Sequence, residues 1–150
     1  MAPSDGISEL LTPERKQILI ASAGLFCISL GVLIPRWGIS LGWLFTITGG
    51  VVGGILIGGL RRRGGVDGFV YGAYVGAVGG LASSIVGVVL GTVINLTTFA
   101  SETSTTPSEY TIGGYVLIAI VGFVSGMVFK LMGASVAGAL VGALLDDRSV

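Results

Sequence analysis

Charged residues are almost absent between Gln17 and Leu145, and this absence constrains the fold more than any other feature. The charged positions in that stretch are Arg36, Arg61, Arg62, Arg63, Asp67, Glu102, Glu109 and Lys130. Over the whole chain 52% of residues are hydrophobic and 11% are charged, whereas charged residues make up about a quarter of an ordinary soluble domain. Because a soluble fold presents charged side chains to water on every element, the sequence predicts a protein dissolved in lipid.

Four apolar segments follow one another along the chain, at about residues 17–34, 38–60, 68–98 and 112–145. A helix of about 20 residues crosses the hydrocarbon core of a bilayer. The segments lack the alternation of polar and apolar residues that transmembrane strands require, and a helix satisfies its backbone hydrogen bonds internally. The sequence therefore predicts an all-α polytopic membrane protein. Its single domain is a four-transmembrane-helix bundle over residues 17–146, with tails at 1–16 and 147–150.

The last two segments are too long for a simple crossing. Each exceeds 30 residues, which corresponds to roughly 45–50 Å of helix. We expect a tall hairpin, joined by the polar loop Ala100–Tyr110, that extends beyond the membrane. In the alternative interpretation the last segment breaks near Gly133, which leaves Ala134–Leu145 as a short re-entrant piece.

The first helix has a start signal at Thr12-Pro13-Glu14. These residues supply an N-cap hydroxyl, a proline suited to the first turn and a carboxylate that the helix dipole favours. A cleaved signal peptide over the first 34 residues is the competing interpretation. It is disfavoured because no small-x-small cleavage site precedes a polar mature start.

Basic residues concentrate on one side of the predicted membrane. With four spans, the two tails and the middle loop share a side, and they contain Arg15, Lys16, Arg61, Arg62, Arg63 and Arg148. The opposite loops contain Arg36 as their one basic residue. Since positive residues stay cytoplasmic, both termini should lie on the cytoplasmic or interior side of a cell membrane or virion envelope.

Glycines recur every four residues in three of the segments. The positions predicted to pack helices are Gly50, Gly54, Gly58, Gly72, Gly76, Gly80, Gly122, Gly126, Gly138 and Gly142. Rows of small residues let two helix backbones approach closely in a membrane. The rows could serve only to close the monomer, or one row could build a homo-oligomer.

Lys130 and the arginine run Arg61-Arg62-Arg63 are the candidate functional cations. Lys130 lies deep in the last span, and an intramembrane charge is a functional-site hypothesis by default. It is predicted to contact a pore or a partner helix. The alternative is that it snorkels to the outer interface or hydrogen-bonds to loop carbonyls. The arginine run is predicted to bind anionic headgroups or to anchor the topology.

The composition gives no support to several classes of function. Histidine is absent and cysteine occurs once, as Cys27, so metal and haem sites lack ligands and a catalytic triad lacks its base. The formal net charge is zero, which gives no reason to expect nucleic acid as a partner. We expect no cofactor and no enzymatic activity.

The middle of the chain contains a distinct glycine pattern, made up of Gly49–Gly59 (GGVVGGILIGG), Asp67-Gly68, Gly72, Gly76 and Gly79-Gly80. This pattern resembles that of a group of small tetraspan proteins common in archaea, known as a domain-of-unknown-function family. The resemblance covers roughly residues 34–91. It implies a four-helix membrane protein and supplies no activity.

Two functions fit these observations. The first is a non-enzymatic structural or accessory subunit of a homo-oligomeric or larger membrane or envelope assembly, whose partners are lipid, its own copies or other membrane proteins. The alternative is a small channel or transporter, with Lys130 and the glycine faces lining the pathway.

Overall fold

The computed structural model describes residues 12–30, 38–62, 64–103 and 109–146. These residues form four helices: α2 (Pro13–Ser29), α3 (Gly38–Arg61), α4 (Gly65–Thr103) and α5 (Glu109–Leu144). The all-α prediction is confirmed for this part of the chain. The predictions for the tail before residue 12, the turn at 31–37, Arg63 and the tail at 147–150 fall outside the described residues.

Three of the four helices are long and apolar enough to cross a membrane. The qualifying stretches are Leu44–Arg61, Gly65–Thr98 and Ile112–Leu144. Helix α2 is 17 residues long and is not among them. It opens with Glu14, Arg15 and Lys16, which shorten its apolar part. The prediction of membrane-length helices is confirmed, and a fourth crossing by α2 stays a prediction.

The polarity of the molecule is inverted relative to a soluble protein. Among the described residues, polar or charged ones that are buried as whole residues are Ser22, Ser29, Ser83, Ser84, Lys130 and Ser135. Large aliphatic side chains cover the outside, and Ile118 and Leu140, for example, are 68% and 61% exposed. Exposed apolar surface on this scale is unfavourable in contact with water. It is favourable in contact with the hydrocarbon of a membrane.

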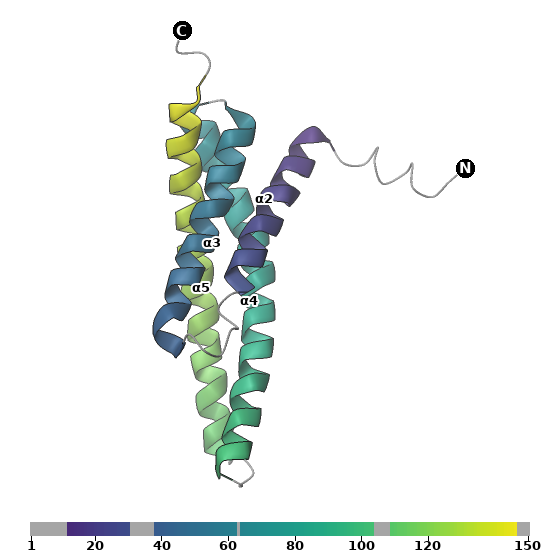
Figure 1. Ribbon diagram of the computed structural model, residues 1–150, viewed down its shortest axis with the longest axis vertical. Helices are drawn as coiled ribbons and strands as arrows, with labels where there is room; N and C mark the ends of the chain where they lie inside the picture. Colours follow the sequence, from purple (N-terminus) through teal and green to yellow (C-terminus); the bar gives the residue numbers. More distant parts are fainter. Residues whose placement is uncertain (1–11, 31–37, 63, 104–108, 147–150) are drawn as a thin grey trace, which may run out of the picture.

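The helices run in alternating directions, and the α4–α5 pair forms the long axis of the molecule (Figure 1). Helix α5 continues without a break through Gly133, so the structure does not adopt the alternative with a re-entrant piece. Both helices also continue into the predicted loop Ala100–Tyr110, since α4 ends at Thr103 and α5 begins at Glu109. At one end the α4–α5 hairpin extends beyond α2 and α3 (Figure 1).

Two rows of glycines hold α5 between α3 and α4. The carbonyl oxygen of Ala134 is approached from one side by Gly54 and from the other by Gly72, so closely that neither position has room for a Cβ. One turn further on, Gly58 and Gly68 flank the carbonyl oxygen of Gly138 in the same way. The contacts join backbone to backbone, as expected where small residues face one another in a membrane.

Helix α2 packs on α3 and α4 through a small apolar core. Ala21 and Leu25 of α2 are fully buried against Ile57 and Val75. A Cβ at Gly79 of α4 would lie 2.8 Å from the carbonyl oxygen of Ser22. Gly79 therefore lets the backbone of α2 pack closely against α4, as the other glycines do for α5.

The turn between α3 and α4 depends on a left-handed backbone. Arg62 has a φ of 45° and Gly64 a φ of 91°. Glycine adopts such a φ without steric cost. A Cβ at Gly64 would also lie 2.9 Å from the carboxylate Oδ2 of Asp146, so this turn and the end of α5 lie at the same end of the bundle.

Candidate functional site

Lys130 lies inside the bundle and points at α4. Its side chain is 5% exposed. The ammonium Nζ donates a 2.9 Å hydrogen bond to Ser83 Oγ and a 3.1 Å hydrogen bond to Ser84 Oγ. Gly80 leaves the space for this, because a Cβ there would come within 3.4 Å of the lysine Cβ. Lys130 therefore contacts a neighbouring helix of its own chain and does not extend to the interface.

A cavity of about 220 Å³ opens between α4 and α5 beside Lys130. Its polar end is formed by Ser29, Thr46, Ser83, Ser84 and Lys130, which come from all four helices. Glycines and apolar or aromatic side chains, with Thr92, line the remainder: Gly87, Val88, Gly91, Tyr115, Ile118, Ala119, Gly122, Phe123 and Gly126. The arrangement is a narrow, largely apolar space with one cation at its end.

The hydroxyls at the polar end differ in their hydrogen bonding. Ser83 accepts from Lys130 and donates to the carbonyl oxygen of Gly80 at 3.2 Å. Ser84 accepts from Lys130, and among the described residues its own hydroxyl hydrogen has no acceptor. Ser29 is 5% exposed, and its Oγ has no hydrogen-bond partner in the part of the chain that the structure describes. This end of the cavity therefore offers unused donors.

Sequence reasoning found Lys130 but did not pair it with the serines that surround it. A signal was present, because folding α4 and α5 antiparallel about the segment 104–108 brings Ser83-Ser84 roughly level with Lys130. Ser29 gave no such signal. It lies on α2, and its position depends on how α2 packs against α3 at Gly49, where a Cβ would collide with Ser29 Oγ.

At nine of the ten predicted packing glycines, an added Cβ would lie within 4 Å of another helix. A Cβ at Gly50 would lie 2.8 Å from the carbonyl oxygen of Lys130, and one at Gly142 would lie 2.6 Å from that of Gly64. Gly126 is looser, since its nearest neighbours would be 3.8 and 3.9 Å away. At Gly122 a Cβ would meet nothing within 4 Å. Gly122 therefore packs against no other helix among residues 12–30, 38–62, 64–103 and 109–146.

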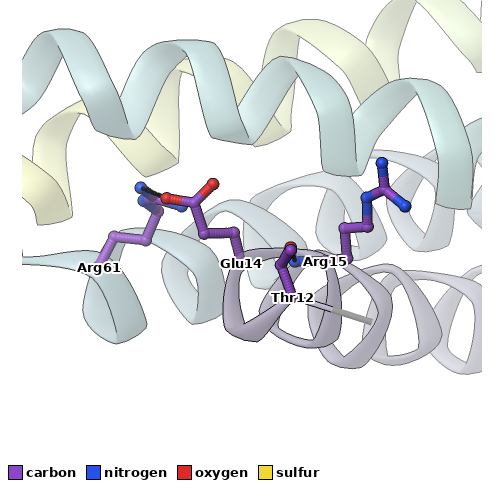
Figure 2. Close-up of polar contacts among 4 residues, drawn as sticks. All are labelled: Thr12, Glu14, Arg15 and Arg61. Carbon is purple, nitrogen blue, oxygen red and sulfur yellow. Dashed lines mark hydrogen bonds and ion pairs between the residues drawn. The ribbon is translucent and has the colours of Figure 1, made fainter. Parts of the chain in front are cut away.

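Arg61 points into the bundle, unlike the headgroup-facing cation that the sequence suggests. Its Nη2 lies 3.1 Å from Glu14 Oε1, and its side chain is 5% exposed (Figure 2). Its guanidinium carbon stands 3.3 Å from the centre of the Tyr71 ring, a cation–π arrangement. Arg62 is exposed, so within the described part of the run it is the cation that remains available to lipid headgroups.

The Arg61–Glu14 pair fixes where α2 begins. Figure 2 shows Glu14 reaching from the first turn of α2 to Arg61 at the end of α3. The same turn is capped by Thr12, whose Oγ1 accepts a 3.4 Å hydrogen bond from the backbone N–H of Arg15. The start of α2 and the end of α3 are therefore tied together at the end of the bundle that also holds Asp146.

The described residues bring together no group of three or more His, Cys, Asp or Glu side chains that could hold a metal ion. The sequence matches no protein-family model, and no curated protein or solved structure matches it. The resemblance to archaeal tetraspan proteins therefore stays a prediction. The chemistry of the site depends on Lys130 and the residues that surround it.

Proposed function

We propose that this chain is a non-enzymatic integral membrane protein that serves as a structural or accessory subunit of a homo-oligomeric or larger membrane assembly. Its inverted polarity supports the membrane location. In the proposed topology α2 also enters the bilayer, and both ends of the described chain lie on the cytoplasmic or interior side. The placement of Glu14, Arg61 and Asp146 at one end of the bundle supports a shared side for both ends. The basic residues Arg15, Lys16, Arg61 and Arg62 favour the cytoplasmic side for that end.

The length of the apolar hairpin is the observation that supports assembly. The apolar stretch of α3 has 18 residues, about 27 Å, which matches a hydrocarbon core of about 30 Å. The stretches of α4 and α5 have 34 and 33 residues, about 50 Å each. A tilt of 40°, the upper end of the usual range, accommodates only about 40 Å of helix. About 10 Å of both apolar helices remains outside the hydrocarbon.

The surface of that projecting part is apolar on α5. Leu117 and Ile118 are 63% and 68% exposed, and Figure 1 shows this part of the hairpin without cover from α2 or α3. Apolar side chains outside the bilayer are unstable in water. Contact with another protein surface would shield these side chains from water. We therefore infer that copies of this chain or another membrane protein pack around the projecting hairpin.

Cysteine crosslinking tests this function. In a Cys27→Ser background, Leu117→Cys places a thiol on the projecting part, whereas Leu140→Cys places one on an equally exposed position of the same helix within the bilayer. We expect a short bis-maleimide, applied to native membranes, to crosslink the Leu117→Cys chain into a dimer or to a partner that mass spectrometry identifies. We expect no crosslink from Leu140→Cys.

Only monomer from the Leu117→Cys chain, with both thiols shown to react with a single-ended maleimide, would contradict the proposal. The channel or transporter alternative has less support, because the glycines that would line its pathway on α3 pack against the backbone of α5. Ion or solute flux through liposomes that contain this protein, lost on Lys130→Ala, would favour that alternative instead.

A further inference from the structure

Three hydrogen-bond donors at the polar end of the cavity lack acceptors. An ammonium has three N–H groups, and Lys130 uses two of them on Ser83 and Ser84. The third N–H, the hydroxyl of Ser84 and the hydroxyl of Ser29 have no acceptor among the described residues. All three residues line the same cavity. A ligand that accepts hydrogen bonds would satisfy all of them.

The same end of the cavity has an uncompensated positive charge. No carboxylate from the described part of the chain lines it, and Asp67, the nearest acid along α4, lies 16 residues before Ser83, about 24 Å along the helix. An ammonium inside a membrane is costly and normally pairs with an opposite charge. The missing partner is therefore an anion, and a monovalent one is enough to balance one lysine.

The remainder of the cavity favours a ligand with an apolar chain. Its lining on α5 extends from Lys130 back to Tyr115, a distance of about 22 Å at 1.5 Å per residue. Val88, Ile118 and Phe123 are among the residues that line it. A bare inorganic ion would leave these apolar surfaces without a contact. A hydrocarbon chain would bury itself against them.

We propose that the cavity between α4 and α5 binds a monocarboxylate with an unbranched apolar chain. The carboxylate accepts hydrogen bonds from Lys130, Ser84 and Ser29, and the chain lies along the cavity toward Tyr115. A charge-assisted hydrogen bond of this kind is stronger than one between neutral groups. The binding requires no second copy of the chain, so its test is independent of the proposed assembly.

Equilibrium binding of radiolabelled decanoate to the purified protein in a neutral detergent tests the proposal. We expect saturable binding with one site per chain, displaced by unlabelled decanoate and at least tenfold less well by decanol, which has the same chain and no charge. Lys130→Met should raise the Kd at least tenfold. Arg62→Met removes the same charge from an exposed position and should leave the Kd unchanged.

Two further variants keep the test decisive if Lys130→Met does not fold, as judged by circular dichroism and gel filtration. Ser29→Ala and Ser84→Ala retain the cation, and each should raise the Kd severalfold. Absence of saturable binding to the folded wild type, or a Kd that all three variants leave unchanged, would overturn the proposal. Tighter binding of chloride than of decanoate would also overturn it, because the apolar walls would then contribute nothing.

Discussion

Gly76 provides the sharpest test of the close packing between α4 and α5. A Cβ at this position would lie 2.6 Å from the Cα of Leu131 and 3.1 Å from the carbonyl oxygen of Lys130. Both are backbone atoms, so no side-chain rotation can relieve the contact. The substitution Gly76→Ala therefore forces α4 and α5 apart.

The magnitude follows from two opposing effects. Overpacking a close contact costs about 1–3 kcal/mol, whereas alanine in place of glycine favours a helix by about 0.5–1 kcal/mol. Gly87 separates the two effects, because a Cβ there meets nothing within 4 Å. It also lies 11 residues further along α4, about three turns, and so on nearly the same face. The propensity gain is common to both variants, so Gly76→Ala should be less stable than Gly87→Ala by about 1–3 kcal/mol.

Reversible unfolding in mixed micelles with increasing SDS, followed by circular dichroism, measures this difference. Gly87→Ala should match or exceed the wild type, whereas Gly76→Ala should unfold at a lower SDS fraction. Equal stability of the two alanine variants would refute the reasoning, because the backbones could not then lie as close together as the structure places them.

Three further experiments test other parts of the fold. Arg61→Ala should lower the free energy of unfolding by about 1–2 kcal/mol, chiefly because the contact with Tyr71 is lost. The control Arg62→Ala should change the free energy of unfolding by less than about 0.5 kcal/mol. The same SDS titration compares the two variants. Thr12→Ala should cost about 0.5–1 kcal/mol by removing the helix cap, visible as a lower thermal midpoint. If α2 lies in the bilayer, the exposed thiol of Cys27 should react with a charged maleimide only after detergent is added. Labelling of Cys27 in intact membranes would show that α2 lies outside the bilayer.

The close helix packing could be predicted from the sequence because it depends on spacing alone. Glycines four residues apart lie on one slowly turning row, and a row without side chains favours a close neighbour. The neighbour itself could not be predicted. Gly122 and Gly126 belong to the same row, yet only Gly126 has another helix within 4 Å. Which part of a row is covered depends on the length of the helices beside it.

The orientation of Arg61 could not be predicted for a different reason. In a soluble helix the apolar stripe shows which face points inward. Helices α3 and α4 are apolar all round, so the sequence contains no such stripe, and an arginine at a helix end fits lipid headgroups as well as a partner. The structure decides the matter through Glu14 and Tyr71, which reach Arg61 from two other helices.

Lys130 marks the boundary between the two halves of the hairpin, and this position explains why a cavity lies beside it. On one side of Lys130 the row continues through Ala134 and Gly138, and the backbones of α4 and α5 nearly touch. On the other side it continues through Gly126 and Gly122, where the approach is loose and then absent. A lysine side chain is too long for a row of glycines, so the helices must separate where it enters. Because α4 and α5 stay apart beyond Lys130, a space remains between them. Lys130 both opens this space and is the only charged residue among those described that line it.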